Sequence, residues 1–145
     1  MSTDGTWWES KHRNRLALRN LRILLAEDDL LLSEMLSDFL TTFYHAEVIA
    51  VTSAAEVLEV IQSQKPDILL SNIVLPDEDG YTLIQKIRTL TPEQGGEIPA
   101  IAITGASAKN RERILEAGFQ AYFSKPFKIR QVIEMIVVLT SSGSK

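Results

Sequence analysis

The amino-acid sequence predicts an α/β fold, in which one five-stranded parallel sheet carries five helices distributed over both of its faces. Short apolar runs alternate with amphipathic stretches from residue 21 onward. The runs are apolar throughout, as in strands buried on both faces, whereas the stretches between them have helical spacing. At 145 residues, with 45% hydrophobic and 23% charged residues, the chain can bury the core of one doubly wound domain.

Each element follows from its local pattern. Residues 21–26 are apolar except for Arg22, which predicts a strand, and residues 46–51 predict the second strand. Residues 29–43, between these strands, place apolar side chains at helical spacing. The expected inward face of this helix consists of Leu32, Met35 or Leu36, Phe39 and Phe43.

The middle of the chain repeats this order. Residues 54–64 predict a helix that ends at Lys65-Pro66, because the residue before a proline disfavours helical backbone. Residues 67–72 predict a third strand, and residues 79–90 predict a third helix. The expected inward faces are Ala54, Val57, Leu58 and Ile61 in the second helix, and Leu83, Ile84, Ile87 and Leu90 in the third.

The last part of the chain adds two further units. Residues 91–97 contain Pro92 and Gly95-Gly96, which predict a loop, and Gly118 is expected to cap the fourth helix. The remaining strands are expected at 98–104 and 120–124, and the remaining helices at 107–117 and 128–139. The last helix is expected to bury Ile129, Val132, Ile133, Ile136 and Val137.

Charge and composition divide the chain into a leader (residues 1–20), a domain (residues 21–140) and a polar tail (residues 141–145). Residues 1–22 hold five Lys/Arg against two Asp/Glu, a net charge of +3, whereas the remainder holds ten against 17, a net charge of −7. The basic leader with Trp7-Trp8 could touch a membrane surface or a partner, but a flexible extension is its ordinary interpretation. The acidic domain argues against direct nucleic-acid binding.

The composition also excludes several classes of protein. The chain has no cysteine, so disulfides and thiolate metal sites are excluded. The first 20 residues lack the apolar run of a signal peptide, and no stretch approaches the roughly 20 apolar residues of a membrane span. A cytoplasmic location is therefore expected.

Three acidic residues follow the first predicted strand, where Glu27, Asp28 and Asp29 are consecutive. Acids near a helix N-terminus cap free amides, which explains one or two of the three. Crowded carboxylates repel each other, so a cation is a natural partner, and oxygen-only ligation suits Mg²⁺. Helix capping and metal binding both stay open at this point.

Polar residues also follow three other strands. Asn72 ends the third strand, Thr104 ends the fourth, and Lys125-Pro126 follows the fifth, where a cis bond would fix the backbone. Each has an ordinary explanation, as a turn asparagine, a helix-flanking hydroxyl or a solvated lysine. Because parallel strands end at one edge of the sheet, where such folds bind ligands, these residues together predict a phosphate- and metal-handling pocket.

In order and spacing, these residues resemble the landmarks of the receiver domain of two-component response regulators. The resemblance covers about residues 21–140 and implies a flavodoxin-like strand order of 2-1-3-4-5. It rests on Ile-Leu-Leu-Ala-Glu27-Asp28-Asp29, Asn72-Ile-Val-Leu-Pro76, Asp79-Gly80, Ala-Ile-Thr104-Gly105 and Lys125-Pro126-Phe127.

The resemblance implies a metal site and a set of switch residues. Glu27 and Asp28 resemble the acidic pair that holds Mg²⁺, with residue 72 and the main-chain carbonyl of Val74 as further ligands. The phosphoryl-binding and switch positions correspond to Thr104 (the switch hydroxyl), Lys125 (the lysine that pairs with the phosphoryl group) and Tyr122 (the aromatic switch). A half-buried strand tyrosine is the ordinary alternative for the last of these.

Asn72 stands where the resembled family has its phosphoacceptor aspartate. An amide lacks the anionic oxygen that attack on a phosphoryl group requires, so we expect no phosphotransfer there and no enzymatic activity. Removing one charge relieves a repulsion of roughly 4 kcal/mol at 4 Å and an effective dielectric near 20. The sequence therefore predicts a more stable metal-free domain that binds Mg²⁺ weakly.

Several functions remain open. The chain can be a natural pseudo-receiver, or an active receiver carrying an introduced Asp-to-Asn substitution at residue 72. A small phosphate-ester hydrolase is disfavoured because no nucleophile or well-placed general base is evident, and a nucleotide-binding module is disfavoured because no Gly-rich loop follows the first strand. The chain is expected to be a stand-alone regulator or a fragment of a larger protein.

The resemblance also implies partners. These are a histidine kinase or phosphotransfer protein, a downstream effector, or a second copy of the chain. A homodimer would use the fourth helix, fifth strand and fifth helix, whose cations form a salt-sensitive interface by hypothesis and a solvated face by default. These cations are Lys109, Arg111, Arg113, Lys128 and Arg130.

Overall fold

A computed structural model describes residues 4–105 and 111–142 of the chain. The described residues form a five-stranded parallel sheet in the order β2-β1-β3-β4-β5, which confirms the expected fold class and strand order. The strands are β1 (Arg22–Ala26), β2 (Glu47–Val51), β3 (Ile68–Asn72), β4 (Ala100–Thr104) and β5 (Ala121–Ser124).

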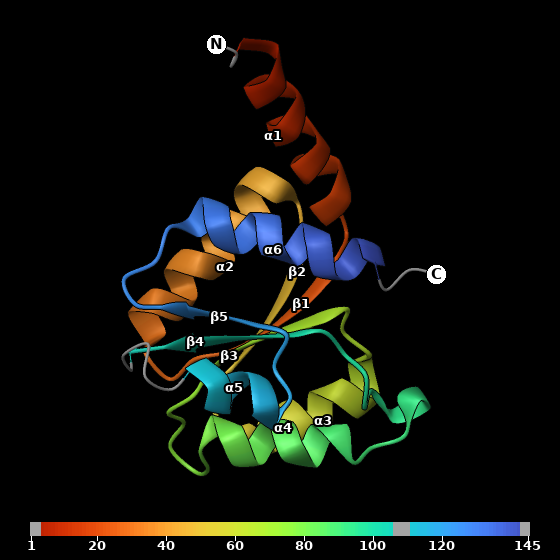
Figure 1. Ribbon diagram of the computed structural model, residues 1–145, viewed down its shortest axis with the longest axis vertical. Coiled ribbons are helices and arrows are strands. Elements are labelled where there is room, and N and C mark those ends of the chain that lie inside the picture. The colour runs from red at the N-terminus through yellow and green to blue at the C-terminus, as the bar shows by residue number, and fades with distance from the viewer. Residues whose placement is uncertain (1–3, 106–110, 143–145) are drawn as a thin grey trace.

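Helices cover both faces of this sheet. Figure 1 shows α2 and α6 on one face and α3, α4 and α5 on the other, while α1 extends away from the body toward the N-terminus. The described helices are α1 (Asp4–Leu18), α2 (Leu30–Tyr44), α3 (Ala54–Gln64), α4 (Gly80–Arg88), α5 (Arg111–Ala117) and α6 (Ile129–Ser142), with one 3-10 helix, η1 (Pro92–Gln94).

The two ends of the domain differ from the expectation. Residues Asp4–Leu18 form helix α1, where the sequence suggested a flexible leader. Packing explains the difference, because Leu18 is fully buried and Ala17 packs against the cluster beneath α2 and α6. The side chains of Trp7 and Trp8 lie outside the described residues. Helix α6 continues to Ser142, and so includes the first residues of the expected tail.

Helix boundaries and turns mostly follow the local signals. The expected loop at 91–97 contains η1, because Thr91 and Gln94 form a capping box around Pro92. Gly118 adopts φ 134° after α5, as expected of a helix-ending glycine, and the bond before Pro126 is cis. The first residues of the fourth expected helix, 107–110, lie outside the described residues.

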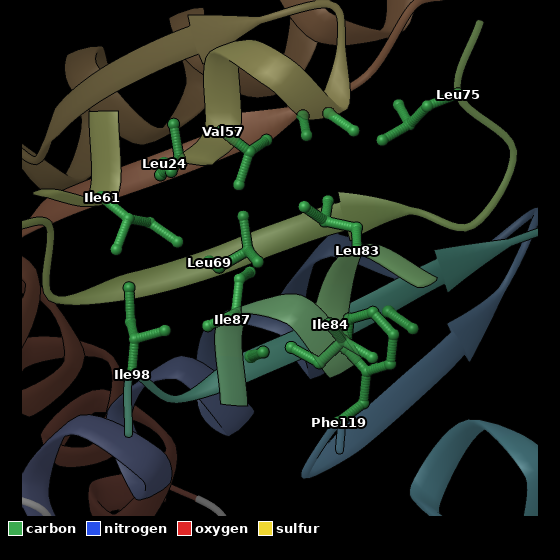
Figure 2. Close-up of a cluster of buried hydrophobic side chains, with 14 of the residues drawn as sticks. Leu24, Val57, Ile61, Leu69, Leu75, Leu83, Ile84, Ile87, Ile98 and Phe119 are labelled. Carbon is green, nitrogen blue, oxygen red and sulfur yellow. The ribbon is translucent and has the colours of Figure 1, made fainter. Parts of the chain in front are cut away.

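One core cluster fills the space between the sheet and the helices α3, α4 and α5. Strands β3 and β4 are buried along their whole length, as parallel strands covered on both faces must be. Figure 2 shows Leu24 and Leu69 of the sheet facing Val57 of α3 and Leu83 and Ile87 of α4. The apolar faces expected for these two helices are therefore confirmed. Six of the expected residues are buried, and Leu58 and Leu90 are partly buried.

A second cluster lies between the sheet and the helices α2 and α6. Leu36 and Leu40 of α2 are buried there, whereas Met35 is 61% exposed and Phe43 is 49% exposed. The expectation that Phe43 faces the core is therefore wrong, because Tyr44 occupies the buried position at the end of α2. The exposure of Phe43 leaves an aromatic surface between α2 and its neighbours.

Candidate functional site

Four of the predicted site residues lie at the carboxyl ends of neighbouring strands. Glu27 follows β1, Asn72 ends β3, Thr104 ends β4 and Lys125 follows β5. Parallel pairing sets this arrangement, since Asn72 is in register with Ile103, next to Thr104. The backbone N–H of Lys125 donates to the carbonyl of Thr104 at 2.8 Å, which fixes the last strand end to its neighbour.

Glu27 is the central acidic group of the site and is only 1% exposed. Its Oε2 accepts hydrogen bonds from Asn72 Nδ2 and from the backbone N–H of Asp29, each at 3.0 Å. Its Oε1 lies 3.2 Å from Lys125 Nζ, close enough for an ion pair but without the geometry of a hydrogen bond. Within the described residues, one oxygen of this buried carboxyl group is therefore satisfied by donors, and the other has Lys125 as its partner.

The side chain of Asn72 has an unambiguous orientation. Its Oδ1 accepts from the backbone N–H of Val74 at 3.1 Å, while its Nδ2 donates to Glu27. The flipped amide would place its oxygen against a carboxylate oxygen and its NH₂ group against an N–H donor, so only one orientation is satisfied. The amide nitrogen therefore faces the acidic centre of the site, and the amide oxygen faces the β3–α4 loop.

The three consecutive acids after β1 have different roles. Asp29 caps α2, because its Oδ1 accepts from the backbone N–H groups of Leu31 and Leu32. Glu27 points into the buried site, and Asp28 is exposed beside it. Capping therefore explains one of the three acids, which leaves Glu27 and Asp28 for the site itself.

The loop between β3 and α4 is held by two aspartates to which sequence reasoning assigned no such role. Asp79 caps α4, and its hydrogen bond from the Thr82 N–H, at 2.7 Å, holds the Asp79 pKa below its usual value. Asp77 reaches the N-terminus of α3, where it accepts from the N–H groups of Ala54 at 2.8 Å and Ala55 at 3.0 Å. These two bonds lower the pKa of Asp77.

The contact made by Asp77 could not have been found by local spacing, because its partners lie more than 20 residues earlier in the chain. The only sequence signal is an acid in a loop that must return toward the N-terminus of another helix. The contact joins the site loop to α3. A movement of this loop must therefore break these two hydrogen bonds or carry the start of α3 with it.

Gly80 allows α4 to begin directly against the end of β3. A Cβ atom at this position would lie 2.8 Å from the Cα of Ile73 and 3.2 Å from the carbonyl oxygen of Asn72. The Gly80 N–H also donates to the Ile73 carbonyl at 2.6 Å. Glycine is thus required by close backbone approach, and this approach positions residue 72.

Comparison with known families places the strand and helix arrangement from β1 onward in one of them. The family described as the response regulator receiver domain matches residues 23–137. The chain belongs to this family. It is therefore a receiver domain of two-component signalling.

Individual relatives support the same assignment. The receiver domain is 34% identical over 122 residues to the transcriptional regulatory protein KdpE of Staphylococcus aureus, covering 81% of this chain and 49% of that protein. The chain spans about half the length of several curated relatives that it matches. A CheY-like receiver domain from Methanospirillum hungatei has 32% identity and a TM-score of 0.74, with 84% and 94% of the two chains covered.

One solved relative holds a metal ion. The receiver domain of a sensor histidine kinase from Pseudomonas aeruginosa has 28% identity and a TM-score of 0.71, over 82% of this chain and 98% of that one. That structure holds a magnesium ion coordinated in its active-site cleft. Within the described part of the present receiver domain, no three His, Cys, Asp or Glu side chains form a metal-binding group.

The residues present fit Mg²⁺ in part. Among the described residues no hydrogen-bond donor reaches the buried Oε1 of Glu27, and the neighbouring residue in the chain, Asp28, is an exposed second carboxylate. Oxygen ligands of this kind suit Mg²⁺. Asn72 contributes poorly, because its oxygen already accepts from Val74 and its nitrogen faces Glu27. The donor set therefore fits a weak magnesium site.

A groove of about 690 Å³ runs beside these residues, between the β3–α4 loop and the start of α5. Val74, Tyr81, Thr104 and Arg113 contribute to its lining. The guanidinium carbon of Arg113 lies 3.9 Å from the centroid of the Tyr81 ring, a cation–π contact that joins α5 to α4. Thr104 is buried at the inner end of this groove.

Tyr122 lies on β5 in register with Ala102 of β4. It is half-buried and packs against the core cluster on the α3, α4 and α5 side of the sheet. It therefore belongs to the strand that leads to Lys125, and it precedes that lysine by three residues.

The described helices include none with the length and hydropathy that crossing a bilayer requires.

Proposed function

We propose that this receiver domain is a pseudo-receiver, which acts by regulated protein–protein interaction and takes up no phosphoryl group at residue 72. The observation that carries the proposal is the hydrogen bond from Asn72 Nδ2 to Glu27 Oε2 at 3.0 Å. An amide donor takes a place in which a phosphoacceptor would present an anionic oxygen. The partners proposed are a histidine kinase or phosphotransfer protein and a downstream effector, in the cytoplasm.

The chemistry of the amide supports this proposal. Uptake of a phosphoryl group requires a nucleophilic oxygen, and carboxylate attack gives an acyl phosphate. The Asn72 oxygen is neutral, and one of its lone pairs accepts a hydrogen bond from Val74, so it is a far weaker nucleophile than a carboxylate oxygen. We propose that the domain has no enzymatic activity of its own.

The electrostatics of the site favour the same state. The Asn72 NH₂ group and the Lys125 ammonium both approach the Glu27 carboxylate, at 3.0 and 3.2 Å. These contacts offset a buried charge that a third carboxylate would increase. Mg²⁺ would be held by Glu27, Asp28 and the carbonyl of Val74, where it would offset the charge of a phosphoryl group. We expect this binding to be weak.

The proposed interaction surface is next to the switch positions. Thr104 and Tyr122 lie on β4 and β5, and we propose that they relay a change in the β3–α4 loop to the surface of α5, β5 and α6. Exposed cations on this surface include Arg111 and Lys128, whereas Lys109 lies outside the described residues. A homodimer through this surface remains a proposal, and salt-dependent sedimentation of Arg111→Glu measures it.

A second candidate is an active receiver in which an aspartate at residue 72 has been exchanged for asparagine. The observation that favours it is the completeness of the surroundings: Glu27, Thr104 and Lys125 occupy the strand ends where a phosphorylatable site would need them. The two candidates differ in one respect. Only in the second candidate would the site take up a phosphoryl group once Asn72 is replaced by aspartate.

Incubation with acetyl phosphate and Mg²⁺ tests both candidates. The chain and an Asn72→Asp variant are compared by intact-protein mass spectrometry, and the double variant Asn72→Asp with Lys125→Ala is the matched control. We expect no phosphate on the original chain. If only Asn72→Asp takes up phosphate, and the double variant does not, the result would support an active receiver that Asn72 has inactivated. If none of the three proteins takes up phosphate, the result would support a pseudo-receiver that acts by binding alone. Phosphate on the original chain at the site would contradict the proposal.

A further inference from the structure

A cavity of about 480 Å³ lies where α1, α2 and α6 meet, and its lining includes none of the residues of the Asn72 site. Its volume falls within the roughly 300–1,000 Å³ of pockets that bind small molecules. Helix α1 contacts both α2 and α6 in this region (Figure 1). The cavity therefore depends on a helix that precedes the receiver core, which begins at β1.

The base of the cavity is aromatic and aliphatic. Phe39 and Phe43 of α2 have ring centroids 4.9 Å apart, and Phe39 and Tyr44 have centroids 5.9 Å apart. Ile133 of α6 is fully buried beneath them. Phe43 remains 49% exposed, so part of this surface is left in water. A flat or extended apolar group would gain contact area here.

The rim of the cavity is cationic. Arg15 of α1 and Arg130 of α6 line it from two different helices, together with Lys11 of α1. Glu134 is the one anion among the lining residues of the described chain. The lining therefore carries a net charge of +2, in a chain whose net charge is −4. Such a local excess selects anions, and guanidinium groups bind carboxylates through paired hydrogen bonds.

We propose that this cavity binds a small amphipathic anion, an acyl or aryl carboxylate. Its apolar part would lie on Phe39 and Phe43, and its carboxylate would contact Arg15 and Arg130. Charge complementarity and the partly exposed aromatic base are the two observations that select this class. Because the arginines come from α1 and α6, the bound anion holds α1 against the domain and stabilises that arrangement by mass action. This inference is independent of phosphate uptake at Asn72.

Titration of the full chain with sodium octanoate, below its micelle concentration, tests the proposal by calorimetry and by amide chemical shifts. Octanol supplies the apolar tail without the charge, and acetate supplies the charge without the tail. We expect saturable one-site binding of octanoate, at least about tenfold tighter than either control. Shifts should concentrate on α1, the end of α2 and the start of α6. Equal binding of octanol, or no saturable binding of octanoate, would overturn the proposal.

Charge reversals locate the site. Arg15→Glu and Arg130→Glu should each weaken octanoate binding about tenfold, because each removes one guanidinium and adds a repulsion. Arg19→Glu is the matched control, since Arg19 is exposed just beyond α1 and does not line the cavity. The octanoate affinity of Arg19→Glu should stay within about twofold of that of the original chain. Equal losses in all three variants would show diffuse charge attraction and overturn the site.

A substitution in the base of the cavity and a vesicle-binding experiment complete the test. Phe43→Ser alters a half-exposed side chain, so the fold should survive, as circular dichroism will show, while octanoate affinity falls. Sedimentation with phosphatidylglycerol vesicles distinguishes a free anion from a lipid surface. Binding to vesicles without binding to octanoate would overturn the proposal in favour of membrane association.

Discussion

The helices on both faces of the sheet pack on buried apolar clusters, but the two faces differ in the polar contacts that accompany this packing. On the side of α3, α4 and α5, polar side chains bond directly to backbone groups of other segments. Asp77 accepts from the N-terminus of α3, and Arg88 donates to the carbonyls of Ile98 and Gly118, which precede β4 and β5. On the side of α1, α2 and α6, apolar side chains supply much of the packing, and a cavity remains between the helices.

From these polar contacts we infer that the α3, α4 and α5 side is the more rigid frame and the α1, α2 and α6 side the more adaptable layer. Bonds to backbone groups fix loops in one arrangement, because a buried carbonyl or amide without its partner costs free energy. Side-chain packing around a cavity can adjust to an occupant. The Asn72 site belongs to the rigid frame, since its loop also caps α3 through Asp77. The proposed anion site belongs to the adaptable layer.

Replacement of Arg88 should have the largest effect on stability. Its guanidinium donates to the carbonyls of Gly96 at 2.9 Å, Ile98 at 2.7 Å and Gly118 at 2.8 Å, in a half-buried position. We expect Arg88→Ala to lower the free energy of unfolding by about 3 kcal/mol, because several carbonyls lose their donor at once. Urea denaturation measures this loss.

The matched control for this change is Arg22→Ala at the N-terminal end of β1. Arg22 also donates to a carbonyl, that of Gln64, and pairs with Glu47 at 3.2 Å, but it is exposed. We expect a loss below about 1 kcal/mol there. Similar losses at the two arginines would mean that Arg88 does not tie the α4 layer to the sheet.

A methyl group at Gly80 should have the next largest effect. Gly80→Ala places a Cβ 2.8 Å from the Cα of Ile73, and backbone atoms cannot easily move away. We expect a loss of about 2 kcal/mol and amide shift changes at Asn72, since overpacking forces the chain to shift. Gly105→Ala is the control, because in the described part of the chain no atom beyond its chain neighbours lies within 4 Å of its added Cβ. If both variants melt alike, close approach at Gly80 is unimportant.

The Asp77 cap should give a smaller, pH-dependent effect. Hydrogen bonds from Ala54 and Ala55 hold the pKa of Asp77 below its ordinary value, so the ionised form is favoured in the folded state. Its contribution is complete above the unfolded pKa and disappears as pH falls through the folded pKa. We therefore expect Asp77→Asn to be less stable than the original at pH 7, with a difference that shrinks below about pH 4.

Urea denaturation at several pH values measures how the difference in unfolding free energy between the original and Asp77→Asn shrinks at low pH. The control is Asp38→Asn, at an exposed position of α2, which lies on the other side of the sheet. A difference between the original and Asp77→Asn that stays constant down to about pH 2 would contradict the proposed role of the ionised carboxylate.

Periodicity in the sequence predicted the sheet and most helices, because buried parallel strands and amphipathic helices leave strong local patterns. The strand ends then predicted that Glu27, Asn72, Thr104 and Lys125 share one edge of the sheet, where the structure also places them. Helix α1 was missed, since its stability depends on burial of Leu18 and not on an amphipathic pattern of its own.

The contacts of Asp77 and Arg88 could not be predicted either. Asp77 bonds to Ala54 and Arg88 to Gly118, 23 and 30 residues away in the sequence, and the position of each charge in a loop or at a helix end does not identify its partner. The orientation of the Asn72 amide also required the structure, because it depends on Val74 and Glu27 together. Spacing locates strand ends, whereas hydrogen-bond partners follow from the packed arrangement.

A carboxylate at residue 72 would be repelled by the Glu27 carboxylate, whereas the Asn72 amide is not, and urea denaturation can measure this repulsion. The chain and Asn72→Asp are compared in EDTA and in millimolar Mg²⁺, with exposed Asn20→Asp as the control for the same chemical change. We predict that Asn72→Asp loses about 2 kcal/mol in EDTA and regains most of it with Mg²⁺, while the original responds little. An Asn72→Asp variant as stable as the original in EDTA, or strong stabilisation of the original by Mg²⁺, would contradict this electrostatic explanation.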